Sequence, residues 1–257
     1  MTPRRVWLVG RGLAAATLVW GVTSALADRP LLLPGPPEVA ASWLDLLASG
    51  RLVAETWVSL RRLGLAYGAA AVAGVALGMA MGQWRPVERI ASPLVNSIRG
   101  VSGIAWIPIA VVWFGVSEWL PVFIIFYGAV FPFVLNAQAG IASVDARLIH
   151  VARSLGASRQ RIALQVILPA TVPYLLTGAR VALGVAWMSI IAAELLGAPT
   201  GLGFSIQYAR MLQQTPKMLA WILWVGVVGF VLDAGMRAAV RRLAPWAGAG
   251  RLTGEPA

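Results

Sequence analysis

The sequence lacks cysteine entirely and contains one histidine, His150, and one lysine, Lys217, among its 257 residues. The absence of thiols excludes a disulfide framework and thiolate chemistry. One histidine is too few for a histidine-based catalytic triad or for a cluster of histidine and cysteine metal ligands. A P-loop needs Gly-Lys-Ser/Thr to hold phosphates, whereas Lys217 stands between Pro216 and Met218. We therefore expect no catalytic site, metal ion or cofactor, and any ATP hydrolysis has to be carried out by another polypeptide.

The composition is that of a membrane protein. Apolar residues make up 59% of the chain, charged residues 12%, and the mean hydropathy is +0.76. The length leaves room for five or six spans of about 20 residues each, but not for a separate soluble domain of about 100 residues. We therefore expect an all-α, polytopic membrane protein with about six transmembrane helices. The net charge of +11 is explained by arginines at span ends rather than by a nucleic-acid partner.

Apolar segments predict where the helices lie. The spans are expected near 6–25, 63–82, 104–115, 119–139, 174–196 and 218–232, with short interfacial helices at 43–47 and 53–60. In the second span, Gly74, Gly78 and Gly82 recur every four residues, which predicts close approach of a neighbouring helix. The third span is short and contains Pro108, so we expect it to line a cavity rather than face lipid.

The first apolar segment allows two interpretations. A basic start followed by Ala25-Leu26-Ala27 and Asp28 resembles a cleavable signal peptide. Gly10 and Gly12, however, interrupt a signal-type core. We favour a retained span.

A segment at 151–170 interrupts the apolar pattern between the fourth and fifth spans. Its three arginines cannot lie in hydrocarbon, although apolar residues recur among them. Gly156 suits the left-handed residue that ends a helix, and Ser158 suits the N-cap of the next. We predict a short helix, a tight break and a second short helix that are offered to a partner, with an ordinary cytoplasmic loop as the simpler alternative.

The same segment resembles the EAA loop of ABC-importer permeases. In that family the motif reads Glu-Ala-Ala, three residues, Gly, nine residues, a β-branched aliphatic, one residue and Leu-Pro. Gly156 and Leu168-Pro169 fall at the matching spacing, whereas His150 and Val151 replace the first two motif residues. Two further segments are similar to permeases of the taurine/sulfonate/nitrate type: 105–108 with 113–115, and 176–180 leading to 192–194 and 201–203.

This resemblance implies a type I ABC-importer permease fold with a cytoplasmic coupling helix between the fourth and fifth spans. It implies as partners a second copy of the chain, cytoplasmic ABC ATPase subunits and a periplasmic or lipid-anchored substrate-binding protein, all around a chain embedded in membrane lipid. The implied substrate is a small anion such as sulfonate, taurine or nitrate. The implied ATPase-coupling residues all belong to the loop: His150, Val151, Ala152, Arg153, Leu155, Gly156, Ala157, Ser158, Leu168 and Pro169.

Basic residues predict the orientation. Segments on the N-terminal side of the membrane carry more than twice as many as the opposite segments, so both termini are expected in the cytoplasm of a bacterium, with the chain in its inner membrane. Arg61 and Arg62 are the exceptions on the outer side. We divide the chain into an N-terminal helix and periplasmic linker (1–54), a permease domain (55–243) and a disordered cytoplasmic tail (244–257).

Two kinds of residue are candidates for the translocation pathway: residues of the short third span around Pro108, and polar residues within the other spans. The polar ones could equally form hydrogen bonds between helices. The candidates are Ile107, Pro108, Ala110, Asn136, Ser189 and Glu194. For Glu194 a structural pair with another helix is favoured over gating or contact with water. Arg180 lies within reach of the inner surface, which favours an anchoring role.

Three functional classes are compatible with a polytopic membrane protein. A secondary transporter or channel should show an internal repeat and ion-coupling acids near the membrane centre, and the sequence has neither. An intramembrane enzyme is disfavoured by the scarcity of histidine, lysine and cysteine. The expected function is therefore the permease subunit of an ATP-driven ABC importer, with the channel or secondary transporter as the alternative.

Overall fold

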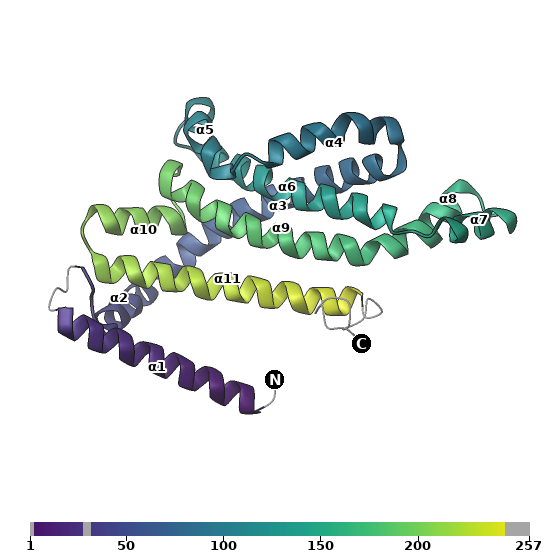
Figure 1. Ribbon diagram of the computed structural model, residues 1–257. Helices are drawn as coiled ribbons and strands as arrows, with labels where there is room; N and C mark the ends of the chain where they lie inside the picture. The colour runs from purple at the N-terminus through teal and green to yellow at the C-terminus, as the bar shows by residue number, and fades with distance from the viewer. Residues whose placement is uncertain (1–2, 28–31, 245–257) are drawn as a thin grey trace. The chain divides into compact units, whose positions relative to one another are not determined.

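The computed structural model describes residues 3–27 and 32–244, and within these ranges the protein is all helical (Figure 1). The helices form two compact units. The first comprises Met1–Ser59 with Thr200–Val228, and the second comprises Leu60–Pro199 with Gly229–Ala257. Apart from Ala244, the expected disordered tail lies outside the described residues.

The first unit contains α1 (Pro3–Ala27), α2 (Pro36–Ala48), the start of α3 (Arg51–Gln83), α10 (Leu202–Met211) and the start of α11 (Thr215–Leu243). Two prolines open α2, where the missing N–H groups cost nothing. The prediction of separate short helices at 43–47 and 53–60 was wrong. Only Ser49 and Gly50, the latter at φ +70°, separate α2 from α3, and no proline or glycine follows in the first three turns of α3 to end it.

The helix α10 was not predicted, and α3 holds its N-terminus in place. The Glu55 carboxylate accepts a hydrogen bond from the Gly201 N–H at 2.7 Å, and the Ser59 hydroxyl accepts one from the Leu202 N–H at 3.0 Å. Both N–H groups would lack an intrahelical partner. The 201–203 motif is therefore a capped helix start.

The second unit is built around α6 (Trp119–Ala142), which lies beside α9 (Leu168–Gly197) (Figure 1). The remainder of α3 packs on the same core, where small residues of three helices meet large ones. The buried core cluster consists of Leu63, Ala66, Ala70, Ile125, Ala129, Phe133, Ala182, Ala186 and Ile190.

The predicted close approach at the glycine face of α3 is confirmed. A Cβ added at Gly74 would lie 2.6 Å from Phe133 Cβ, and one at Gly82 would lie 2.8 Å from Ile141 Cβ. At Gly78 the added atom would collide with the Val134 carbonyl oxygen. No side chain fits at these positions, so the backbones of α3 and α6 come as close as glycine allows.

Among the residues that the structure describes, four helices are long and apolar enough to cross a membrane: α3, α6, Gln160–Gly197 and α11. A fifth span results if α4 (Arg85–Arg99) and the pair η1 (Gly103–Trp106) and α5 (Ile107–Phe114) count as one, bent by 84°. The third span was expected at 104–115, which corresponds to η1 and α5, and α4 would be its polar first half if the pair crosses as one span. The described apolar part of α1, Ala14–Ala27, is shorter, so the count of six stays a prediction.

Candidate functional site

The segment between α6 and α9 begins with α7 (Ala146–Ser154). Asp145 caps this helix, because its carboxylate accepts a hydrogen bond from the Arg147 N–H at 2.8 Å. Asp145 also places a negative charge at the positive end of the helix dipole. The chain therefore starts a new helix immediately after the span.

Gly156 ends α7 in the way the sequence predicts. Its φ is +77°, its N–H donates to the Arg153 carbonyl at 2.9 Å, and the Ala157 N–H donates to the Ala152 carbonyl at 3.0 Å. These two bonds form a Schellman motif, which requires a left-handed residue at this position. The direction of the chain after α7 thus depends on one glycine.

The next helix, α8 (Arg159–Ile162), starts at the predicted N-cap, since the Ser158 hydroxyl accepts a hydrogen bond from the Arg161 N–H at 3.3 Å. The expectation that this second helix is short and separate was wrong. A π-helical turn, η2 (Ala163–Ile167), joins it to α9. Pro169 does not interrupt this connection, because it lies in the first turn of α9, where proline is tolerated.

We refer to α7, the Gly156 turn and α8 as the coupling segment (146–162). It lies at the end of α6 and α9 that is remote from α5 (Figure 1). Its apolar side chains stay exposed: Leu148 and Val151 at 57% each, and Leu155 at 82%. Exposed apolar side chains grouped on a helix outside the spans are typical of a protein-binding surface. The residues from His150 to Ser158 that the sequence analysis predicted to couple to an ATPase lie together here, whereas Leu168 and Pro169 lie one π-turn further on.

A groove of about 590 Å³ lies beside α6 in the second unit. Asn136 lines it, with its side-chain amide donating to the Pro132 carbonyl at 2.8 Å. Arg99 also lines it, and its Nε donates to the Asn96 side chain at 3.0 Å. Ser189 lies behind the groove wall, where its hydroxyl would be 2.8 Å from a Cβ added at Gly128.

The three pathway candidates of α5, Ile107, Pro108 and Ala110, differ in their exposure. Ile107 and Ala110 are buried in a cluster with Leu120, Ile124 and Ala193, whereas Pro108 is exposed. Contact of Ile107 or Ala110 with a pathway therefore needs a conformation other than this one.

Glu194 is fully buried and forms a 2.8 Å ion pair with the equally buried Arg62. Arg62 also bonds the half-exposed Glu118, which receives a second bond from Arg61 at 2.8 Å. The structural pair favoured for Glu194 is thus confirmed. Arg61 and Arg62, which the predicted topology left unexplained, neutralise Glu118, immediately before α6, and Glu194 on α9. The signal in the sequence was two arginines within an apolar helix, but it did not identify their partners.

The hydrogen bond from Arg62 lowers the pKa of Glu118. Glu118 stands immediately before α6, outside the span. Arg180 likewise has an acid partner, because its Nε lies 3.4 Å from Asp233 Oδ1, and both side chains are nearly half exposed.

Comparison with known proteins identifies a family, several sequence relatives and a solved structure that resemble this chain. The family described as binding-protein-dependent transport system inner membrane component matches residues 71–245. The taurine transport system permease protein TauC of Escherichia coli (strain K12) is 38% identical over 237 residues, which cover 90% of this chain and 86% of TauC.

A second relative is the putative aliphatic sulfonates transport permease protein SsuC of Bacillus subtilis (strain 168). It is 34% identical over 242 residues, 93% of this chain and 88% of SsuC. Among solved structures, an inward-facing conformation of the MetNI methionine ABC transporter aligns with a TM-score of 0.65 at 20% identity, covering 74% of this chain and 95% of that chain. This last likeness concerns the fold alone.

Proposed function

The chain belongs to the family of binding-protein-dependent transport system inner membrane components, and on that premise we propose that its coupling segment receives the ATPase. The chain is a transport subunit of an ABC importer and not its catalytic ATPase. Family membership implies an ATPase and a substrate-binding protein as partners. The observation that carries the docking proposal is the exposed apolar face of α7, held at a fixed angle by the Gly156 turn.

Force can pass from this segment into the membrane because α8, η2 and α9 run on without a break. When ATP closes the two ATPases, the docked segments move with them. A continuous helix converts that movement into tilt or rotation of α9. ATP thereby shifts the equilibrium between inward-facing and outward-facing states through its different affinity for the two.

The translocation pathway follows the groove beside α6. Asn136 supplies a polar group along it, and Arg99 supplies a positive charge. Pro108 is exposed in this conformation, while Ile107, Ala110 and Glu194 would join the pathway only in another. Ser189 would control how closely α9 approaches Gly128 on α6.

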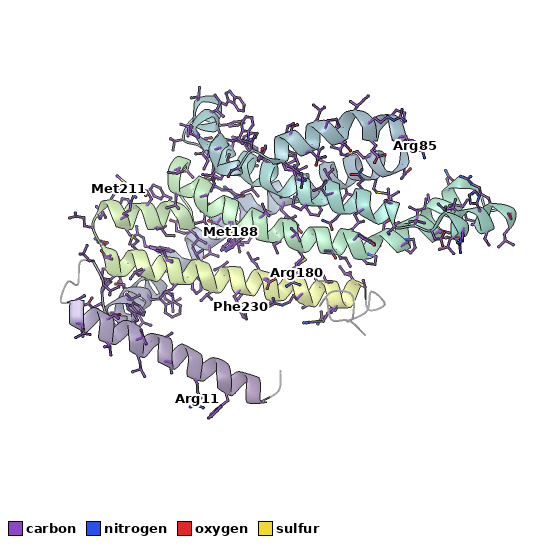
Figure 2. All side chains as sticks on the ribbon, in the orientation of Figure 1. Arg11, Arg85, Arg180, Met188, Met211 and Phe230 are labelled. Atoms are coloured by element: carbon purple, nitrogen blue, oxygen red, sulfur yellow. The ribbon has the colours of Figure 1, made fainter. Side chains whose placement is uncertain are left out.

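Two copies of the chain form the pathway in our proposal. Apolar side chains such as Met188, at 78% exposed, and Phe230, at 64%, extend from α9 and α11 (Figure 2). Such side chains require lipid or another protein around them. The permease domain is taken as 55–243, and both termini are placed in the bacterial cytoplasm.

The substrate is a small anion, with an aliphatic sulfonate such as taurine as the first choice. The proposal follows the taurine and sulfonate relatives and the positive charge of Arg99 in the groove. The substrate-binding protein would select the compound, and the permease would pass it on.

Co-purification of the chain with its ATPase and uptake assays in proteoliposomes test the proposal. We expect a stoichiometric ATPase and uptake of a sulfonate that needs both ATP and the binding protein. Substitution of Leu155 by Asp should release the ATPase, whereas Met211→Asp, at an exposed position on α10 outside the apolar spans, should not. Uptake by the chain alone, driven by an ion gradient, would favour the secondary transporter.

A further inference from the structure

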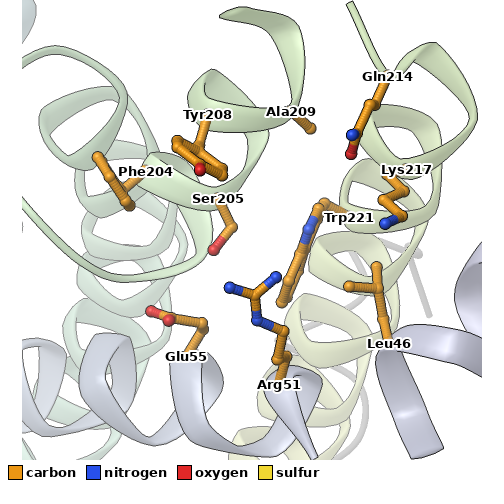
Figure 3. A pocket seen from close by; sticks show the side chains of 10 residues that line it. All are labelled: Leu46, Arg51, Glu55, Phe204, Ser205, Tyr208, Ala209, Gln214, Lys217 and Trp221. Atoms are coloured by element: carbon orange, nitrogen blue, oxygen red, sulfur yellow. The ribbon is translucent and has the colours of Figure 1, made fainter. Parts of the chain in front are cut away.

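The first unit contains a pocket of about 140 Å³ that has no part in coupling or in the groove (Figure 3). The end of α2, the start of α3, α10 and the start of α11 line it. Figure 3 shows the Arg51 guanidinium pointing between Glu55 and Trp221 toward Ser205. Lys217 lies beyond Trp221. The volume is below the roughly 300–1,000 Å³ of sites for drug-sized ligands, so only a small molecule fits.

Positive charge dominates the groups that remain available in this pocket. The Arg51 guanidinium has no hydrogen bond or ion pair with any other residue that the structure describes. The Lys217 ammonium lies 3.7 Å from Asp45, a long contact between partly exposed side chains. Glu55 is the one acid in the lining, and its carboxylate already accepts the Gly201 N–H. Ser205 adds a hydroxyl donor that an anion can use.

Two helix N-termini add to the positive electrostatic potential of the pocket. Arg51 is the first residue of α3, and α11 begins two residues before Lys217. The residues ahead of these helices, Gly50 and Gln213, both have positive φ, +70° and +56°. Gln213 is the single non-glycine residue with positive φ in the described chain. Residues at both helix starts line the pocket, so the partial positive charges of two helix N-termini lie near it.

We propose that this pocket binds the oxyanion group of a small molecule between Arg51 and Lys217, with the hydrocarbon part of the ligand against Trp221. Sulfonate and carboxylate both have suitable oxygens for an arginine fork. That the ligand is the transported sulfonate rests on the proposed function. In chain order α10 follows the end of α9, and the coupling segment precedes its start. In the chain, α10 and its pocket residues thus follow the end of the span at which, in the proposed orientation, a binding protein releases substrate.

The absence of cysteine allows a direct test. Ser205→Cys places a single thiol in the pocket of the complete permease–ATPase complex, in nanodiscs of phosphatidylcholine. The thiol is treated with a methanethiosulfonate reagent that carries a sulfonate, or with its trimethylammonium analogue. Met211→Cys is the control, because Met211 is exposed on the same helix and does not line the pocket.

We expect the rate ratio of the anionic to the cationic reagent to be about tenfold higher at Ser205→Cys than at Met211→Cys, as one well-placed charge allows. Taurine should protect the thiol at position 205 alone. Adding Arg51→Gln should remove most of the preference, whereas Arg51→Lys should retain it. Arg210→Gln, a neutralised exposed arginine of α10 outside the pocket, should leave it unchanged. Equal ratios at both thiols would overturn the proposal.

The outcomes also separate this proposal from the proposed function. If the complex imports a sulfonate but taurine protects neither thiol, the pocket proposal fails and the function stands. If no sulfonate is imported yet inorganic sulfate protects position 205, the pocket stands and the substrate is wrong. Protection that requires phosphatidylglycerol in the nanodisc, and that no soluble anion reproduces, would assign the pocket to a lipid headgroup and overturn the small-molecule site.

Discussion

The coupling segment and the helix bundle formed by α6, α9 and α3 from Leu60 onward belong to the same unit but maintain their structure in opposite ways. The bundle is fixed by contacts between distant parts of the chain: glycines against backbone and a buried ion pair. The coupling segment is fixed by contacts between neighbours in sequence: the Asp145 cap, the Gly156 turn and the Ser158 cap. Substitutions in the bundle should therefore affect folding, and those in the coupling segment should affect what the folded protein does.

The largest effect is expected from Arg62→Leu. This change leaves the buried Glu194 without its cation, which costs about 3–5 kcal/mol of unfolding free energy. Thermal unfolding in detergent should show a large drop in melting temperature and low yield. The double variant Arg62→Leu with Glu194→Leu should recover most of the loss, because an apolar pair needs no counter-charge. If the double variant is no better than the single one, the ion pair does not explain the burial of Glu194.

A smaller loss, about 1–3 kcal/mol, is expected from Gly78→Ala, because the new methyl group collides with α6. The matched control is Gly68→Ala. Gly68 belongs to the same helix, and no heavy atom lies within 4 Å of an added Cβ there. The control should be neutral or slightly stabilising, since alanine favours helix. Equal stability of the two variants, measured by thermal unfolding, would contradict the close contact of α3 and α6.

The third prediction moves to the coupling segment. Gly156→Leu forces a side chain into a left-handed conformation at a cost of about 1–2 kcal/mol, and misdirects α8. We expect normal insertion, a loss of thermal stability no larger than this cost, and ATP hydrolysis uncoupled from transport. Gly156→Ala should give a milder form of the same defect, because an added Cβ meets no other atom within 4 Å. Wild-type transport by Gly156→Leu at normal expression would remove this turn from the mechanism.

The comparison also explains what the sequence could and could not predict. The coupling segment was predictable because its determinants are local: a glycine and a serine at fixed spacing define the turn and the next N-cap. The glycine face of α3 was predictable because a four-residue period identifies one helix face. The positions of the span ends were predicted less accurately. The prediction missed α10 because its N-terminal caps come from Glu55 and Ser59, more than 140 residues earlier in the chain.

The buried ion pair shows the same limit. Arg62 and Glu194 are 132 residues apart, and no local pattern relates them. A charge within an apolar helix signals that a partner exists, but only the tertiary fold identifies it. For the same reason the pocket around Arg51 had no signature in the sequence, since four separate helices line it.

A smaller effect is expected on the pH dependence of stability when Glu118 is replaced. Because Arg62 lowers the pKa of Glu118, the folded protein holds this proton less tightly than the unfolded chain does. The resulting stabilisation is present above the ordinary carboxylic pKa, about 4.3, and is lost as the pH falls through the lowered value. Glu118→Gln should therefore unfold at a lower temperature at neutral pH and show a shallower decline in acid. Parallel melting curves of the two proteins against pH would contradict the assignment.

The smallest effect is expected from His150→Glu, which restores the acid of the EAA motif. Position 150 is exposed in the middle of α7, with Arg147 three residues before it and Arg153 three residues after it. A carboxylate there gains two helical neighbours of opposite charge, worth about 0.2–0.5 kcal/mol each, so α7 should be slightly more stable. We expect unchanged complex formation and transport, with His150→Gln as the uncharged control. If His150→Glu releases the ATPase while His150→Gln retains it, the partner presents negative charge at this position. The ATPase would then have changed its interface together with the replacement of the motif acid by His150 in this chain. Its surface that faces α7 should be sought among its acidic residues.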